Sequence, residues 1–290
     1  MPTKIEKDSI TGIETTGHEW DGLMELNNPL PRWWLWVLIA TIVWSLGYWV
    51  VYPAWPVPGM GHTKGMFGYS SRAALDTEVN AAKAGQAQML AKISAVPVEE
   101  IARDPDMRAF ALAAGRSAFQ INCSQCHGTG AAGSAGFPNL NDDDWLWGGK
   151  VTDIYRTLQY GVRWTHDDTR LSDMPAFLTD GILKSNQIDD VVDFVLSLGG
   201  KQAAPAAAAR GKQVYAEQCA VCHGESGKGN IEVGSPNLTD GIWLYGGDRN
   251  AIITSVRYSR KGVMPGWGDR LDATTLKELA VYVHALGGGR

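Results

Sequence analysis

The sequence predicts an all-α protein in which one membrane-spanning helix near the N-terminus is followed by two similar helical domains. Three observations support this fold class. Residues 33–52 form an uncharged run near the start of the chain. A Cys-x-x-Cys-His motif occurs twice, at residues 123–127 and 219–223. The residues around the two motifs also repeat, which indicates a tandem duplication of one helical unit.

The overall composition sets limits on the class of protein. A chain of 290 residues is long enough for about two domains, and an apolar content of 44% is ample for packed cores. The net charge of −5 argues against a protein that binds nucleic acid, because such proteins normally carry a basic surface. Residues 1–30 contain charges of both signs without hydrophobic periodicity, so we expect an extended or loosely ordered segment there.

The uncharged run WWLWVLIATIVWSLGYWVVY predicts a transmembrane helix, which we place at residues 31–53. As a helix the run spans roughly 30 Å, the thickness of a bilayer core, so the lipid bilayer is an expected partner. Pro31 suits a helix start and Pro53 marks its end. Aromatic residues at both ends of the run fit the two membrane interfaces. A cleaved signal peptide is the alternative, but a long polar segment precedes the run and no Ala-x-Ala site follows it.

Residues 54–107 are expected to form a spacer that contains helices. The Ala-, Lys-, Gln- and Glu-rich residues 72–93 favour a helix, and residues 96–100 begin a second, shorter one. Asp104 followed by Pro105 predicts an N-cap and a proline at the first helical position. This third helix is expected to run to about Asn122 and to lead into the first cysteine motif.

Cys-x-x-Cys-His is the attachment motif of c-type haem. Two thiols at this spacing can form thioethers with the vinyl groups at one edge of a porphyrin, and the next residue can offer its imidazole to the iron. We therefore expect two covalently bound haem c groups. There are two alternatives, a redox dithiol and a zinc site made from both cysteine pairs. The zinc site leaves the two histidines that follow the cysteines unexplained. The expected attachment and ligand residues are Cys123, Cys126 and His127 in the first motif and Cys219, Cys222 and His223 in the second.

The repeat extends well beyond the cysteine motifs. Residues 138–140 match 236–238, residues 145–147 match 243–245, and both halves close with an apolar helical pattern followed by two glycines. In each half, the sequence thus indicates six elements in order: a helix, a haem motif, a glycine-rich loop, a helix, a methionine loop and a terminal helix. That is the order of elements in a class I cytochrome c domain. We place the two domains at residues 108–200 and 210–290, with an alanine-rich linker at 201–209.

Two methionines are candidates for the second axial position on each iron. Met174 and Met264 both precede a proline and occupy matching positions in the repeat. In the order of the sequence, Met174 would bind the first haem iron and Met264 the second. A thioether ligand raises the reduction potential and closes the iron, which suits electron transfer. His166 is the rival ligand in the first half, and an open or His-ligated iron would instead suit peroxidase or gas-binding chemistry.

Further residues narrow the class of diheme cytochrome. The lead contains His18-Glu19-Trp20-Asp21-Gly22 and residues 25–34 (ELNNPLPRWW), and the Trp-rich span ends in residues 52–56 (YPAWP) before the two haem domains. In these features residues 10–290 resemble the diheme c-type subunits of bacterial cbb3-type cytochrome c oxidases, the CcoP/FixP family. Resemblance to class I cytochromes c also implies that the backbone carbonyls of Pro138 and Pro236 accept a hydrogen bond from the ligating histidines. The aromatic residues at 145, 147, 243 and 245 could contact a haem or simply pack.

The family resemblance implies an electron-transfer subunit with no oxygen-reducing residues of its own. Its electrons would come from a soluble or membrane-bound cytochrome c or from the bc1 complex. They would pass through two haems to a monohaem subunit (CcoO/FixO) and then to the haem–copper subunit (CcoN/FixN), which reduces oxygen and pumps protons, with a small subunit (CcoQ) nearby. In bacteria, c-type haem is attached on the outer face of the inner membrane. We therefore expect the chain in the bacterial inner membrane, with a cytoplasmic N-terminus and periplasmic haem domains. The alternatives are a free-standing membrane-anchored diheme carrier, a diheme peroxidase and a haem-based gas sensor.

Overall fold

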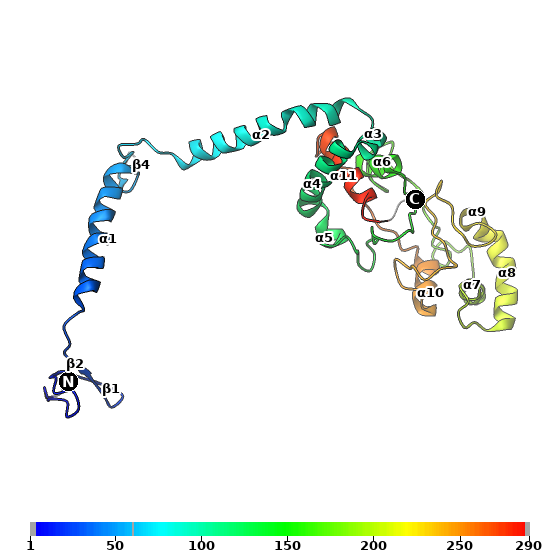
Figure 1. Cartoon of the computed structure of the whole chain (residues 1–290). Coiled ribbons are helices and arrows are strands. Elements are labelled where there is room, and N and C mark those ends of the chain that lie inside the picture. The colour runs from blue at the N-terminus through cyan, green and yellow to red at the C-terminus, as the bar shows by residue number, and fades with distance from the viewer. Residues whose placement is uncertain (1–3, 60, 288–290) are drawn as a thin grey trace. The chain divides into compact units, whose positions relative to one another are not determined.

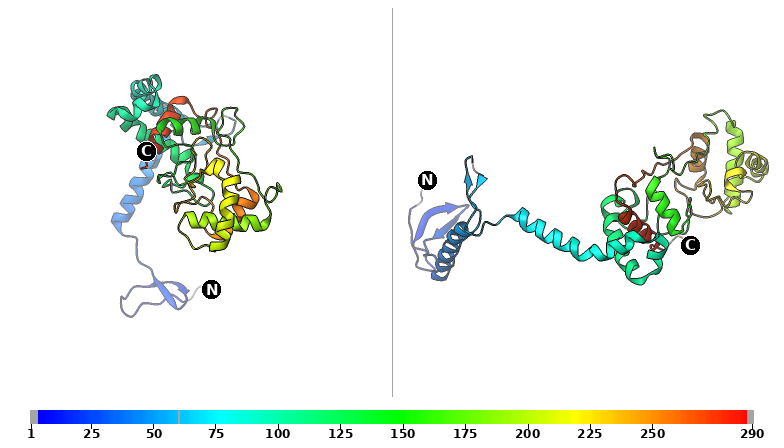
Figure 2. Two further views of the ribbon diagram at one scale, coloured as in Figure 1. Left: turned by 90° about the vertical axis from the view of Figure 1, so that its right-hand side faces the viewer. Right: turned by 90° about the horizontal axis from the view of Figure 1, so that it is seen from above.

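The structure is a computed structural model that describes residues 4–59 and 61–287 in two compact units, 1–84 and 85–290. The ends of the predicted segments 1–30 and 210–290 lie outside the described residues. Figures 1 and 2 show the elements of each unit, which are described separately below.

The polar lead forms a β-hairpin, so the expectation of an extended or loosely ordered segment was wrong there. Strand β1 (Thr15–Trp20) pairs antiparallel with β2 (Leu23–Leu26), and Trp20 lies opposite Leu23. The two residues between the strands, Asp21 and Gly22, both have positive φ, at 50° and 85°. Two-residue hairpin turns of this kind favour Asp-Gly, so this dipeptide was the available sequence signal.

Helix α1 (Arg32–Val51) matches the predicted membrane-spanning helix. It is long and apolar enough to cross a membrane, and none of its residues is buried within the chain. Its last turn is completed by the segment that follows, because the amides of Met66 and Phe67 donate to the carbonyls of Val50 and Val51 at 3.0 and 3.1 Å. The short strands β3 (Pro56–Val57) and β4 (Gly61–His62) pair within this connection.

The predicted spacer contains helices α2 (Ser71–Ala95) and α3 (Val98–Arg103), and α4 (Pro105–Asn122) leads to the first motif. The predicted cap of α4 is confirmed: the Asp104 carboxylate accepts a hydrogen bond from the Met107 amide at 2.8 Å, with Pro105 at the first helical position. Lys277 fixes the C-terminal end of α2 by donating to the carbonyls of Ile93, Ser94 and Val96 at 3.2, 2.9 and 2.7 Å.

From Val98 onward, the helices of the second unit form two lobes, each with its own buried core. The first lobe contains α3, α4, α5 (Ser124–His127), α6 (Val151–Tyr160) and α11 (Ala273–His284). The second lobe contains α7 (Ser185–Leu198), α8 (Pro205–Gln218), α9 (Ala220–His223) and α10 (Arg249–Tyr258). In Figure 1, red α11 lies beside green α4, and α7 lies beside yellow α8.

The structure groups these helices differently from two consecutive domains at 108–200 and 210–290. The last helix of the first sequence half, α7, packs on α8, and the last helix of the second half, α11, packs back on α4. Matching aromatic pairs mark the two contacts. The rings of Phe119 and Tyr282 lie 5.5 Å apart between centroids, and those of Tyr215 and Phe194 lie 5.1 Å apart. The two sequence halves have therefore exchanged their terminal helices.

Two connecting segments carry the chain between the lobes, one at residues 161–173 and the other at 259–263. They run against each other where they cross. The amide of Met264 donates to the carbonyl of Val162 at 3.0 Å, and the amide of Val162 donates back at 2.9 Å. Lys261 also forms an ion pair with Asp173 at 2.5 Å. The two backbone hydrogen bonds hold Met264 against the residues that follow α6 in the first lobe.

Candidate haem sites

Each Cys-x-x-Cys-His motif forms one short helical turn at the end of a long helix. The amide of Cys123 donates to the Phe119 carbonyl at 2.8 Å, which closes the last turn of α4. The amide of His127 donates to the Cys123 carbonyl at 3.0 Å, within the short helix α5. The second motif repeats this geometry after α8, where the amide of His223 donates to Cys219 at 2.9 Å. Both cysteines and the histidine of a motif therefore lie in one compact turn.

The ring of each motif histidine is held by a backbone carbonyl, as predicted. Nδ1 of His127 lies 3.1 Å from the Pro138 oxygen, and Nδ1 of His223 lies 3.1 Å from the Pro236 oxygen. A carbonyl can only accept, so Nδ1 must donate and Nε2 keeps its lone pair. Burial lowers the pKa of both histidines, although the carbonyl contact acts in the opposite direction. The neutral imidazole that binds a metal ion is thus the favoured form.

The first cysteine of each motif does not have the character of a reactive thiol. Burial raises the pKa of Cys123 and of Cys219 to about 11 in each case, with a smaller contribution from the second cysteine of the motif. Reactive dithiols need a lowered pKa, because the thiolate is the nucleophile. Across residues 4–59 and 61–287, the structure also brings together no group of three His, Cys, Asp or Glu side chains that could share a metal ion. The two motifs therefore do not combine into the zinc site considered above.

Each candidate methionine packs in the lobe of the other sequence half. Met264 contacts the core that contains Cys123 and the helices α4, α6 and α11. Met174 contacts the core of the second lobe, where Cys219 and Tyr215 also pack. The hydroxyl of Ser259 donates to the Met174 carbonyl, and the amide of Phe177 donates to Val256 of α10 at 3.1 Å. The structure thus brings Met264 together with the first motif and Met174 with the second, the reverse of the sequence order.

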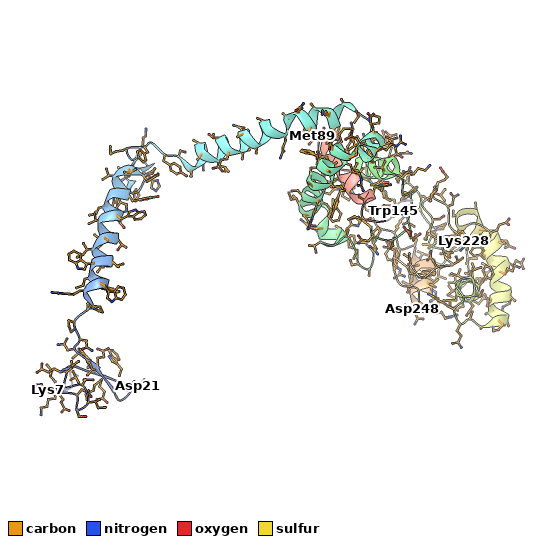
Figure 3. All side chains as sticks on the ribbon, viewed as in Figure 1. Lys7, Asp21, Met89, Trp145, Lys228 and Asp248 are labelled. Carbon is orange, nitrogen blue, oxygen red and sulfur yellow. The ribbon has the colours of Figure 1, made fainter. Side chains whose placement is uncertain are left out.

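Unpaired polar groups in the first lobe fit a haem with acidic substituents. Trp145 Nε1 and Arg170 Nε are buried and have no hydrogen-bond partner within the residues that the structure describes. Figure 3 labels Trp145 in the first lobe. Both groups donate hydrogen bonds, so a carboxylate such as a haem propionate would satisfy them. Together with the thiols, the neutral imidazole and the thioether, the residues present suit haem c.

Two arginines are site residues that the sequence analysis missed. The guanidinium of Arg170 lies 5.5 Å from the Trp147 ring, and that of Arg260 lies 4.9 Å from the Tyr245 ring. Arg170 precedes Met174, and Arg260 precedes Met264, at the same distance along the chain. Their matching positions in the repeat were the signal that could have identified them.

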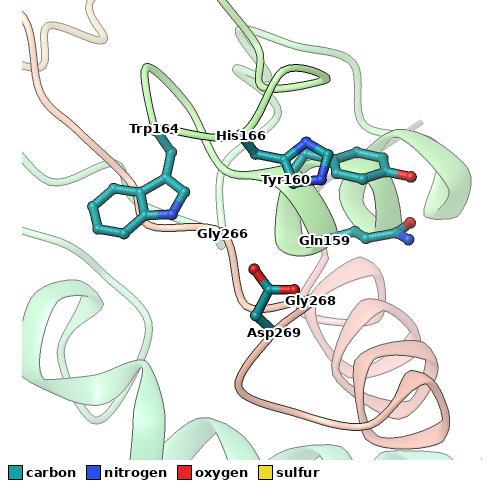
Figure 4. Close-up of a pocket in the computed structure, with 7 residues that line it drawn as sticks. All are labelled: Gln159, Tyr160, Trp164, His166, Gly266, Gly268 and Asp269. Carbon is teal, nitrogen blue, oxygen red and sulfur yellow. The ribbon is translucent and has the colours of Figure 1, made fainter.

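The rival ligand His166 lies in the first connecting segment. Its ring lies against that of Tyr160, with centroids 4.6 Å apart and the ring planes tilted by 41°. Its Nδ1 accepts a hydrogen bond from the Asp168 amide at 3.0 Å. Figure 4 shows His166 with Trp164 and Asp269 around a cavity of about 120 Å³. These contacts hold the imidazole at the crossing of the connecting segments.

Comparison with known proteins connects these sites with a respiratory complex. Residues 12–58 match a model described as the N-terminal domain of cytochrome oxidase-cbb3, FixP, and residues 206–283 match cbb3-type cytochrome c oxidase subunit III. Residues 112–199 match the cytochrome c model. The chain is 53% identical to a cbb3-type cytochrome c oxidase subunit CcoP of Azospirillum sp. (strain B510), over 98% of each chain. It is 52% identical to the subunit FixP of Rhizobium meliloti (strain 1021), over 97% of each.

The chain belongs to the CcoP/FixP family of cbb3-type cytochrome c oxidase subunits. A member from Cereibacter sphaeroides is 49% identical over the full length of both chains. The predicted family, the two haem c cofactors and the role as electron-transfer subunit of an oxidoreductase complex are confirmed by this membership. As a CcoP/FixP protein the chain works with the catalytic part of the oxidase, and α1 fits a single membrane span.

Proposed function

We propose that each haem of this electron-transfer subunit is held by residues from both sequence halves. Cys123, Cys126 and His127 would hold the first haem, with Met264 as its second axial ligand. The second haem would be held by Cys219, Cys222 and His223, with Met174 as its second ligand. When bound, haem c takes up and releases one electron at its iron. The observation that carries this assignment is the packing of each methionine in the core of the opposite motif.

The protein's contribution is to fix the ligands and exclude water. The Pro138 and Pro236 carbonyls orient the histidine rings, so that Nε2 of each faces away from the carbonyl. Backbone hydrogen bonds fasten the methionine loops to α6 and α10. The Trp267 amide donates to the Leu158 carbonyl of α6 at 2.9 Å, and the Phe177 amide donates to the Val256 carbonyl of α10 at 3.1 Å. A rigid ligand set with a closed iron supports electron transfer and leaves no open position for a peroxide or gas ligand.

Chains that retain only one haem would test this ligation directly. With Cys123 and Cys126 both changed to serine, only the second haem can be attached. Met174→His is then expected to lower the reduction potential of the remaining haem and change its absorption spectrum, whereas Met264→His should leave both unchanged. The mirror experiment uses Cys219 and Cys222. If Met264→His altered the second haem instead, the ligands would follow the order of the sequence and this assignment would be wrong.

We infer further that the chain accepts electrons from a cytochrome c or the bc1 complex and passes them to the monohaem subunit (CcoO/FixO). From there they would reach the haem–copper subunit (CcoN/FixN), which reduces oxygen and pumps protons, with CcoQ nearby. Family membership and the two closed haem sites support this route. Purification of the tagged chain from gently solubilised membranes should bring b-type haem and oxygen uptake with it. A chain that purified alone, with only c-type haem, would instead be a free-standing carrier.

The inferred location is the bacterial inner membrane, with residues 1–30 in the cytoplasm and both lobes in the periplasm. The support is chemical, because c-type haem is attached on the outer face of that membrane and α1 is the one helix of sufficient length and hydropathy among the described residues. Protease added to intact spheroplasts should remove the haem lobes and leave the N-terminal hairpin intact. Cleavage of the hairpin alone would reverse the orientation.

A further inference from the structure

Two aromatic residues in the loops between motif and helix reach from one lobe to the other. Trp147 lies in the loop of the first lobe, and its indole ring lies directly against Gly234 in the second lobe. A β-carbon on Gly234 would overlap the ring atoms Cδ2, Cε2 and Cζ2 of Trp147. Gly234 also has a φ of +59°. The close approach of the ring therefore requires glycine at this position.

The loop under the Trp147 ring is the one that holds the second motif. Ser235 follows Gly234 directly, and its hydroxyl donates to the Cys222 carbonyl at 2.5 Å. The carbonyl of the next residue, Pro236, accepts the hydrogen bond from His223 Nδ1. The indole of the first lobe therefore supports the backbone that orients the histidine of the second lobe.

A looser contact of the same kind runs in the other direction. Tyr245, which matches Trp147 in the repeat, lies in the second lobe, and a β-carbon on Gly136 would lie 3.5 Å from its Cε1 atom. The amide of Gly136 donates to the carbonyl of Leu244 at 2.8 Å. Gly136 begins the segment that leads to Pro138, whose carbonyl orients His127. Each lobe thus contributes one aromatic ring to the loop that holds the other lobe's histidine.

The two arginines keep these rings in place. Arg170 lies 5.5 Å from the Trp147 ring and forms an ion pair with Asp153 of α6 at 3.5 Å. Arg260 lies 4.9 Å from the Tyr245 ring, and it donates to the Ala251 carbonyl at 2.5 Å and to the Ser255 hydroxyl at 2.7 Å. Both arginines lie in or next to the connecting segments. Each ring therefore contacts both the haem loop of the other lobe and a cation.

We propose that Trp147 is a positioning residue for His223 and that Tyr245 is a positioning residue for His127, so that each haem's reduction potential depends on a ring from the other lobe. This inference rests on the proposed haem ligation. Loss of a ring would free the loop, weaken the hydrogen bond to the histidine and change the basicity of the iron ligand. Each haem site thereby depends on a protein contact with the other lobe.

Potentiometric titration of the full-length chain in the purified complex tests this proposal, with each haem's wave assigned beforehand by Met174→His or Met264→His. Trp147→Ala should shift the reduction potential of the second haem by roughly 59 mV, which is a tenfold change in the equilibrium constant for its one-electron reduction. The potential of the first haem should stay unchanged. Tyr245→Ala should do the reverse. Trp147→Phe should restore most of the original value. Trp164→Ala is the matched control, because this indole stacks on Arg270 instead and should move neither wave.

A second variant keeps the test decisive if Trp147→Ala impairs folding. Gly234→Ala should shift the second haem's wave in the normal chain, because the new methyl group overlaps the indole ring. In the Trp147→Phe background, where Cε2 and Cζ2 of the indole are gone, the same change should have a smaller effect, because mainly the strain of an alanine at a φ of +59° remains. Equal effects in both backgrounds would overturn the proposal, and so would a Trp147→Ala shift in the first haem or in neither. Failure of the Met→His variants to move one wave each would refute the ligation itself.

Discussion

Gly115 in α4 lies directly against the backbone carbonyl of Glu278 in α11, where no β-carbon would fit. The matching residue of the second lobe, Gly211 in α8, lies in the same way against the carbonyl of Asp190 in α7. These two crossings define which helices belong together. They join the helix that opens one sequence half to the helix that closes the other.

A larger side chain at the first crossing should separate α4 from α11. We expect Gly115→Leu to lower the free energy of unfolding by about 1–3 kcal/mol, because the side chain cannot enter the contact without moving a backbone. Thermal unfolding followed by circular dichroism would measure this. Gly85→Leu is the matched control, since Gly85 is an exposed helical glycine with nothing within 4 Å of its β-position. If the two variants were equally stable, the close contact between α4 and α11 at Gly115 would be refuted.

The N-cap of α4 should contribute measurably to the first lobe. Asp104→Ala removes the acceptor of the Met107 amide, and we expect a loss of about 1 kcal/mol in the free energy of unfolding. Chemical denaturation gives the value. Asp106→Ala removes a nearby exposed carboxylate of the first turn and should cost less, so a larger loss at Asp106 would argue against the cap.

Lys277 should fasten α11 to the end of α2. Its ammonium group donates to three carbonyls, so Lys277→Met leaves those acceptors without their charged donor. We expect a loss of about 1.5–3 kcal/mol and faster amide hydrogen exchange in the last turn of α2. The exposed Lys212 on α8 offers a control, and Lys212→Met should change neither quantity. Unchanged amide hydrogen exchange in the last turn of α2 of Lys277→Met would show that this contact does not stabilise the helix end.

Glu278 should make stability depend on pH. Burial, with a smaller contribution from Asp272, raises the pKa of this carboxyl from 4.5 to about 7. The folded state therefore binds the proton more tightly, and this stabilisation is complete below pH 4.5 and is lost as the pH rises through about 7. Glu278→Gln should remove a slope of at most about 1.4 kcal/mol per pH unit in that window. Denaturation curves across the window would show it, and exposed Glu225→Gln should keep the full slope.

Much of the fold followed from local signals. The uncharged run predicted α1 to within one residue at each end, and Asp104-Pro105 predicted the start of α4. The contacts of Pro138 and Pro236 with the motif histidines were predicted from resemblance to class I cytochromes c. The hairpin at Asp21-Gly22 was missed because the surrounding strands have little apolar alternation.

The pairing of helices could not be read from the sequence. Helices α7 and α11 end their halves with nearly the same apolar pattern, and Phe194 and Tyr282 present equivalent rings to α8 and α4. Hydrophobic periodicity reports which face of a helix is buried, but not which of two similar helices covers it. The ligand order of the methionines depends on that choice, so the sequence order alone was not sufficient.

The crossing of the connecting segments makes the haem-bearing unit resemble a dimer of two interlocked half-chains. A single protease cut in the connection between α7 and α8 leaves two fragments, one with α4 and α7 and the other with α8 and α11. Each fragment would lack a helix for its own core and find it in the other. The nicked protein should therefore elute as one particle in gel filtration, and neither half should fold as an independent gene product.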